Sequence, residues 1–144
     1  MFKTIVVAID GSEQSAHALA TACDIADKYK AAVHLVHSPE LETTAIAVGS
    51  GAVAITPEPE KIAAAGKHVM EQAVKQAEAQ GCKPAECIIG NGEPADEILQ
   101  QAEKSKADLI VTGRRGLGGL ASLLLGSVSH KVSQNAPCTC MTVK

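Results

Sequence analysis

The sequence predicts an α/β fold in three layers, a doubly wound sheet of five parallel strands between two layers of helices. Short apolar runs rich in β-branched residues recur along the chain, beginning with residues 4–9 and 32–37. Such runs are typical of parallel strands that are buried on both faces. Segments with apolar residues at helical spacing separate them, and this alternation favours right-handed β-α-β crossovers. The length of 144 residues fits one domain over residues 1–144.

The first half of the chain gives two strands and two helices. A strand over residues 4–9 is followed by Ser12, a suitable N-cap, and by a helix with its apolar positions between residues 16 and 26. A second strand covers residues 32–37. Residues 40–56 show no clear periodicity and are interpreted as a mobile loop, after which a helix over residues 62–80 stops at Gly81.

The second half continues the alternation. Residues 87–89 form the third strand, Pro94 opens a helix, residues 109–112 form the fourth strand, residues 128–136 a helix and residues 138–143 the fifth strand. With the strand order 3-2-1-4-5, the winding reverses between strands 1 and 4. Ligands bind at such a switch point, beyond the carboxyl ends of the strands. Asp10 and Gly113, which end these two strands, are therefore expected to face one another.

Charge is distributed unevenly along the chain. Residues 109–144 contain four basic residues and no Asp or Glu, so this stretch has a charge of +4. The whole chain has a charge of −3, and the first 108 residues therefore have a charge of −7. The C-terminal stretch is therefore the part suited to binding an anion. The acidic overall charge argues against nucleic acid and membrane surfaces as partners.

Other compositional features narrow the function further. Only Phe2 and Tyr29 are aromatic, so recognition of bases by aromatic stacking is not expected. The five cysteines show no zinc-ligand spacing and are expected to be reduced thiols, as in the cytoplasm. No signal peptide or membrane span is expected, because Asp10 interrupts the first apolar run and no apolar run reaches about 18 residues.

The segment from Gly113 to Ser129 has the features of a phosphate-binding cradle. Gly113 and Gly116 permit close approach of backbone N–H groups to phosphate oxygens, and Gly126-Ser127 opens a helix whose N-terminus favours an anion. Hydroxyl groups and guanidinium groups can add further hydrogen bonds to phosphate. These groups come from Arg114, Arg115, Ser127 and Ser129.

This segment resembles the G-x2-G-x9-G-[ST] motif of ATP-binding universal stress proteins. Gly113, Gly116, Gly126 and Ser127 match it. The resemblance extends over nearly the whole chain, including Asp10-Gly11-Ser12, the Gly-x-Pro-Ala step at residues 92–95, Leu-Leu-Gly-Ser-Val-Ser at residues 124–129 and Ala-Pro-Cys at residues 136–138. It implies the adenine-nucleotide α-hydrolase-like fold.

The resemblance also implies a ligand and a partner. ATP or AMP is the expected ligand, with Mg²⁺ or Mn²⁺ held through its phosphates, and a homodimer through residues 138–143 is the expected assembly. Asp10 would contact the ribose or adenine side. Backbone around Ala8, Ile9, Ser38 and Thr112 would line the base pocket, and the phosphates would contact Gly113, Gly116, Gly126, Ser127 and Val128.

Several other functions are disfavoured by the residues. Residues 49–54 and 116–121 both fit G-x-G-x-x-A, but Pro57 leaves no room for a helix after the first, and no acidic residue follows the second to bind a ribose. A P-loop is absent, and the five histidines share no metal spacing. Cys138 and Cys140 lie two apart on one strand, which rarely allows a disulfide.

The resemblance therefore implies a nucleotide-dependent stress-response or regulatory module. Hydrolysis is expected to be slow or absent, because no general base or nucleophile triad is evident beside the cradle. Two alternatives remain open at the level of sequence. One is an ATP-hydrolysing or adenylyl-transferring enzyme of the same superfamily. The other is a nucleotide-free dimer that acts through protein interactions.

Overall fold

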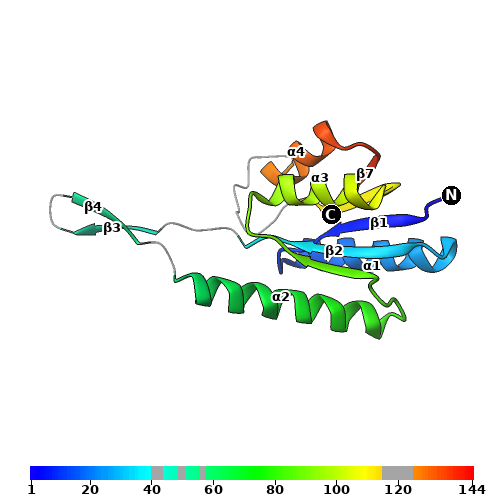
Figure 1. Cartoon of the computed structure of the whole chain (residues 1–144), viewed down its shortest axis with the longest axis horizontal. Helices are drawn as coiled ribbons and strands as arrows, with labels where there is room; N and C mark the ends of the chain where they lie inside the picture. Colours follow the sequence, from blue (N-terminus) through cyan, green and yellow to red (C-terminus); the bar gives the residue numbers. More distant parts are fainter. Residues whose placement is uncertain (40–43, 49–50, 56–57, 115–124) are drawn as a thin grey trace.

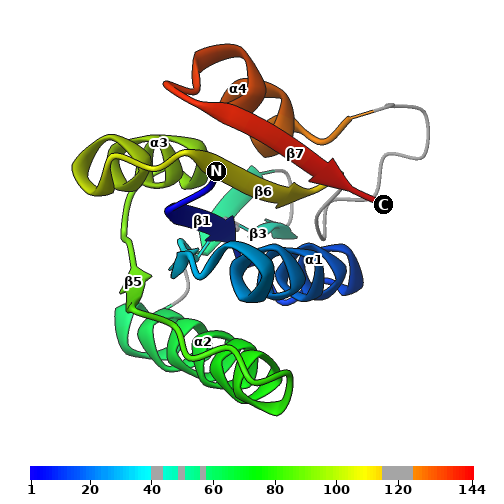
Figure 2. The same cartoon turned by 90° about the vertical axis from the view of Figure 1, so that its right-hand side faces the viewer.

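A computed structural model describes residues 1–39, 44–48, 51–55, 58–114 and 125–144. Its main sheet has five parallel strands in the order β5-β2-β1-β6-β7. Numbered as the five strands of this sheet along the chain, that order is 3-2-1-4-5, which confirms the prediction. Figure 2 shows the three layers, with α1 and α2 on one face of the sheet and α3 and α4 on the other.

The boundaries lie within three residues of those predicted. The five strands of the main sheet are β1 (Thr4–Ala8), β2 (Ala32–His37), β5 (Glu86–Ile89), β6 (Leu109–Gly113) and β7 (Thr139–Val143). The four helices are α1 (Glu13–Tyr29), α2 (Pro59–Ala79), α3 (Pro94–Ser105) and α4 (Ser127–Asn135). Two left-handed residues, Lys30 and Lys106, follow α1 and α3. The predicted stop at Gly81 has a positive φ of 75°, which glycine adopts at little steric cost.

The two faces of the sheet carry separate cores. Ile5, Val7, Leu109 and Val111 pack toward α1 and α2, whereas Val6 and Ile110 pack toward α3 and α4. Residues 5–7 of β1 and 109–111 of β6 are fully buried. Burial of the central strands on both faces explains why their sequences are continuous apolar runs without polar alternation.

The prediction that residues 40–56 form a loop is wrong for ten of those residues. Residues 44–48 and 51–55 form β3 (Thr44–Val48) and β4 (Gly51–Ile55), an antiparallel pair separate from the main sheet. Figure 1 shows this hairpin projecting from the carboxyl edge of the main sheet. The rest of the predicted loop lies outside the described residues.

The sequence signal for this hairpin was an alternation of β-branched residues with alanine. The register pairs Ile46 with Val53, and the next pair along the ladder is Ala45 with Ala54. A period of two is the strand signal. Because alanine is itself apolar, however, the pattern shows no alternation between apolar and polar residues and is easily overlooked.

Asp108 connects the starts of two strands. Its Oδ2 accepts hydrogen bonds from the backbone N–H groups of Lys3 at 2.7 Å and Thr4 at 3.0 Å. Asp108 immediately precedes β6, and Thr4 begins β1. These two backbone hydrogen bonds hold the pKa of the Asp108 carboxyl below its usual value, because they stabilise the charged form.

The substitution Asp108→Asn is expected to lower stability at neutral pH, with a difference from wild type that shrinks as the pH falls. A carboxyl whose pKa is lowered by folding stabilises the native state above its unfolded pKa, about 4, and this contribution disappears as the pH drops through the folded pKa. Urea unfolding between pH 3 and pH 8 measures the difference. Asp24→Asn, at an exposed site on α1, is the control. Equal stability of Asp108→Asn and wild type across this range would contradict the assignment.

Candidate functional site

The backbone of Arg114 joins three elements at the carboxyl edge of the main sheet. Its N–H donates to the carbonyl of Val143 at the end of β7, at 2.6 Å. Its carbonyl accepts from the N–H of Gly126 at 2.8 Å and from Ser129 Oγ at 3.1 Å. These bonds place the N-terminus of α4 directly beside the ends of β6 and β7.

The N-terminus of α4 presents backbone donors that no described residue accepts from. Gly126 is the N-cap, with φ −67° and ψ 157°, and it supplies no side-chain cap. Its carbonyl accepts the first helical bond, from His130 N–H at 2.9 Å. Among the described residues, none accepts a hydrogen bond from the N–H of Ser127, Val128 or Ser129. Free N–H groups together with the helix dipole favour an anion at this position.

Other helix N-termini in the molecule are occupied differently. Ser12 Oγ accepts from Ser15 N–H at the start of α1, and the Glu93 carboxylate accepts from Ala95 and Asp96 N–H at the start of α3. The start of α2 has no side-chain cap but carries Pro59 in its first turn, and proline has no N–H to donate. The start of α4 therefore combines free donors with a position against the main sheet.

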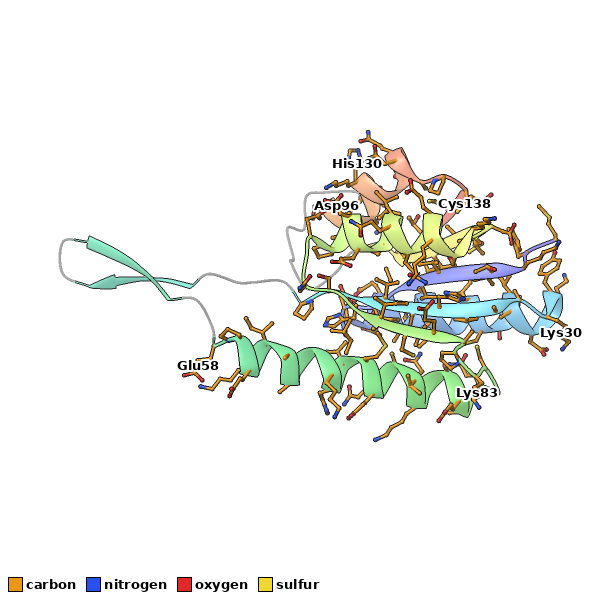
Figure 3. All side chains as sticks on the ribbon, in the orientation of Figure 1. Lys30, Glu58, Lys83, Asp96, His130 and Cys138 are labelled. Carbon is orange, nitrogen blue, oxygen red and sulfur yellow. The ribbon has the colours of Figure 1, made fainter. Side chains whose placement is uncertain are left out.

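Two carboxylates near α4 are paired with a single lysine of the same helix. Lys131 Nζ lies 2.7 Å from Glu93 Oε2 and 2.9 Å from Asp96 Oδ1. These contacts raise the pKa of Lys131 above its usual value. Figure 3 shows Asp96 and His130 on the adjoining helices α3 and α4. The ion pairs reduce the repulsion that an anion at the start of α4 would meet.

Three strand ends lie side by side on the face of the sheet that α3 and α4 cover. Ala8 packs against the core on this face, and the alternation along β2 and β6 places Ser38 and Thr112 on the same face. The registers of β1 with β2 and with β6 make Ala8 the central of the three. Ser38 Oγ donates to the carbonyl of Gly92, which joins β2 to the turn before α3. Ala8, in the middle of this group, carries only a methyl side chain.

The opposite face is closed by α1. A Cβ on Gly113 would lie 2.9 Å from the backbone carbon of Gln14 and 2.9 Å from its Cβ. Real Cβ atoms do not approach so closely, so glycine at this position allows the first turn of α1 to pack on the end of β6. The end of β6 is therefore closed to a ligand on the α1 face.

Asp10 occupies the turn between β1 and α1. Its Oδ1 accepts from Ser12 N–H at 2.8 Å, and among the described residues this is the one hydrogen bond that its carboxylate makes. Preceding it, Ile9 N–H donates to the carbonyl of Val36. The Ile9 carbonyl accepts from His37 Nδ1 at 2.7 Å. The turn is thus fixed, with one carboxylate oxygen left to a ligand.

His37 is the residue of this region that sequence reasoning missed. It is 7% exposed, ends β2 and holds the peptide next to Asp10. Because a carbonyl can only accept, the proton must lie on Nδ1, so Nε2 is an acceptor whenever the ring is neutral. The signal in the sequence was a polar residue as the last member of an apolar strand.

Most predicted site residues lie at this carboxyl edge. They are Ala8, Ile9, Asp10, Ser38, Thr112, Gly113, Arg114, Gly126, Ser127, Val128 and Ser129. Arg115 and Gly116 lie outside the described residues. The Ser129 hydroxyl, predicted as a phosphate donor, instead donates to the Arg114 and Gly126 carbonyls, both at 3.1 Å. What Ser129 offers a ligand is its backbone N–H.

A separate hollow of about 120 Å³ lies between α1 and α2, on the opposite face from α4. It is lined by residues that include Ile9, Ser12, Val69 and Gln76. Gln76 Nε2 donates to the Ala16 carbonyl across its lower end at 2.8 Å. Basic side chains and free helix N–H groups are absent from its lining, so it does not suit a phosphate.

No three His, Cys, Asp or Glu side chains of the described residues gather where they could hold a metal ion. No helix among those described is both long enough and apolar enough to cross a membrane.

Comparison with known proteins places the chain in a family. The family model named Usp, universal stress protein family, matches residues 1–144. This chain belongs to the universal stress protein family. The universal stress protein YxiE of Bacillus subtilis is 38% identical over 152 aligned positions, and the alignment covers 100% of both chains.

Solved structures of universal stress proteins share the fold. The universal stress protein from Archaeoglobus fulgidus in complex with dAMP is 26% identical, with a TM-score of 0.70 over 99% of this chain and 98% of that one. A universal stress protein in complex with cAMP is 27% identical, with a TM-score of 0.73 over 99% of this chain and 96% of that one. Both of these relatives therefore hold an adenine nucleotide.

Replacement of Gly113 by alanine is expected to destabilise the chain by roughly 1–3 kcal/mol, the usual range for overpacking. The obstructing atoms include the backbone of Gln14, which cannot swing aside as a side chain does. Denaturant unfolding measures the loss. Because shortening Gln14 leaves its backbone in place, the double variant Gly113→Ala with Gln14→Ala should not recover wild-type stability. A Gly113→Ala variant as stable as wild type would contradict the proposed close packing of α1 on β6.

Proposed function

We propose that this universal stress protein binds ATP at the carboxyl edge of its main sheet, with the phosphates at the N-terminus of α4. One observation carries the proposal: the N–H groups of residues 127–129 have no described acceptor at a helix start that is fixed against the sheet. An adenine nucleotide is the ligand class favoured by the relatives that hold dAMP and cAMP. Under this proposal, AMP can also occupy the same site.

The nucleoside would extend from α4 toward β1 and β2. Asp10 has a free carboxylate oxygen that can accept from ribose hydroxyl groups, and backbone around Ala8, Ile9, Ser38 and Thr112 would surround the base. Gly113, Arg114, Arg115 and Gly116 would contribute backbone donors and positive charge to the phosphates. Mg²⁺ or Mn²⁺ would be held by the phosphates themselves, since the described residues offer no cluster of metal ligands.

Hydrolysis would be slow or absent, and the protein would act through occupancy of the site. Catalysis of hydrolysis needs a base that can take a proton from water. In the described residues, Asp10 is held in its turn by Ser12 and the Ser129 hydroxyl is committed to two carbonyls. The proposed role is a regulatory module of the stress response in the cytoplasm.

The last strand would form a homodimer. β7 is an edge strand of the main sheet, and none of the described strands lies on its outer side. Thr139 and Thr142 are exposed, while Cys140, Met141 and Val143 are partly exposed. An uncharged edge strand can pair with a second copy of itself around a two-fold axis.

Ser127→Pro is expected to weaken ATP binding about tenfold, the loss that one charge-assisted hydrogen bond of about 1.4 kcal/mol represents. Ser127 is the first residue of α4, where proline is tolerated, and Gly126 already has the extended backbone that a following proline requires. The change therefore removes one N–H donor and leaves the helix intact. Isothermal titration with ATP, AMP and adenosine measures the effect.

The matched control is Ser127→Ala, which removes the same hydroxyl and keeps the N–H. A loss in Ser127→Pro beyond that in Ser127→Ala isolates the backbone donor, and adenosine should bind both variants alike. Wild-type affinity of Ser127→Pro for ATP would refute placement of the phosphates at α4. Wild-type protein that binds no ATP at millimolar Mg²⁺ would refute the proposed function.

Thr142→Asp is expected to convert the dimer to a monomer, because the two-fold axis would bring like charges together across the paired strands. Thr142 is exposed on β7, so the fold of the monomer should be little affected. Sedimentation velocity measures the oligomeric state. The control is Cys87→Asp on β5, the other edge strand. If Cys87→Asp were a monomer and Thr142→Asp a dimer, the interface would lie at β5, and the proposed interface at β7 would be wrong.

A further inference from the structure

Within the described part of the chain, the hydroxyl of Thr112 has no hydrogen-bond partner. Thr112 is 4% exposed, and its Oγ1 is the one buried side-chain nitrogen or oxygen atom among the described residues that lacks a partner. A buried hydroxyl without a partner destabilises the folded state, because it gives up its hydrogen bonds to water. Such an atom in a native structure calls for an explanation, and a functional site is one of the usual ones.

The fold does not require this hydroxyl. Thr112 follows Leu109, Ile110 and Val111, which are fully buried apolar residues of the same strand. Valine has nearly the same shape as threonine and would satisfy the packing of β6 without a polar atom. The hydroxyl is therefore a cost to folding that another residue could have avoided.

Its position connects it to the proposed site. Thr112 lies one residue before Gly113 and two before Arg114, whose carbonyl holds the start of α4. It shares a face of the sheet with Ile110, on the side covered by α3 and α4, and it lies beside Ala8 of β1. The hydroxyl thus lies on the α3–α4 face of the sheet, close in sequence to the residue that holds the start of α4.

A neighbouring hydroxyl shows what a purely structural role looks like. Ser129 is also buried, at 3% exposure, but its Oγ donates to two carbonyl groups within 3.1 Å. Thr112 Oγ1 has no such acceptor. Of these two buried hydroxyls, one on β6 and one on α4, the Thr112 hydroxyl is the one that no described residue binds.

We propose that Thr112 Oγ1 donates a hydrogen bond to a phosphate oxygen of the bound nucleotide, which makes Thr112 a residue that selects for phosphorylated ligands. This inference rests on the proposed function. Phosphate is favoured over ribose because a phosphate oxygen accepts only, so it matches a hydroxyl donor. The dipole of α4 also draws the anion to the β6 side, whereas the Asp10 carboxylate repels it from the β1 side. Since Oγ1 is enclosed, the contact requires rotation of the Thr112 side chain toward the open end of the strand.

The two effects of Thr112→Val have opposite signs. Valine removes a buried hydroxyl that lacks a partner, so the melting temperature of the nucleotide-free chain is expected to rise. The same change removes a side-chain donor to phosphate, so the Kd for ATP and AMP is expected to increase about tenfold. The Kd for adenosine should change little, because the proposed contact with the base is made by the backbone of Thr112, which valine keeps. Thr112→Ser retains the donor and should keep ATP and AMP affinity within about threefold of wild type.

The experiment measures thermal unfolding of the nucleotide-free proteins and isothermal titration with ATP, AMP and adenosine. Wild-type affinity of Thr112→Val for ATP would overturn the inference and leave the proposed function standing. An equal loss for adenosine and ATP would also overturn it, because the contact would then be to the nucleoside. A melting temperature of Thr112→Val below that of wild type would show that a buried water already hydrogen-bonds the hydroxyl. The inference would then lose the observation on which it rests. A wild-type chain that binds no nucleotide would refute both proposals.

Discussion

The hydrogen bonds of the Arg114 peptide group determine where the candidate site can form. One bond joins the end of β6 to the end of β7, and two more hold the first turn of α4 against the same point. Whatever path residues 115–124 take, the chain returns at Gly126 to within 2.8 Å of the Arg114 carbonyl. Free N–H groups on a loosely attached helix would bind an anion weakly, because part of the binding free energy would be spent on ordering that helix. Attachment to the sheet means that the donors are already in place.

The side of the sheet available to a ligand follows from packing as much as from charge. On one face, the first turn of α1 touches the end of β6 so closely that only glycine fits at residue 113. On the other face, the strand ends carry Ala8, Ser38 and Thr112, with no large side chain among them. The hollow between α1 and α2 lies on the first face and lacks positive charge. Steric closure on one face and free donors on the other therefore point to the same place.

Much of this organisation could be predicted because it depends on short stretches of sequence. Continuous apolar runs identified the strands of the main sheet, Ser12 identified the start of α1, and the spacing of Gly113, Gly126 and Ser127 pointed to the connection between β6 and α4. The family match over residues 1–144 confirms the resemblance that the glycine motif indicated. What failed was the loop predicted over residues 40–56, because the alternation of alanine with β-branched residues in β3 and β4 contains no polar position.

Long-range contacts account for what the sequence could not show. The bond from His37 to the Ile9 carbonyl joins residues 28 positions apart, and the Ser129 hydroxyl finds its acceptor 15 positions away. The missing partner of Thr112 is likewise a property of the folded chain, because a threonine at the end of a strand gives no sign in the sequence of whether its hydroxyl is hydrogen-bonded. Local patterns thus predict which residues gather at the site, and packing decides which of their polar atoms remain free.

The most direct test of ATP binding at α4 is the change in backbone amide NMR signals when ATP is added to the wild-type chain. If the phosphates bind there, the amide signals of Ser127, Val128 and Ser129 shift together and saturate with one Kd, while those of Gln72 and Gln76 beside the α1–α2 hollow stay in place. Shifts confined to Gln72, Gln76 and their neighbours, with residues 127–129 unchanged, would contradict the proposed site.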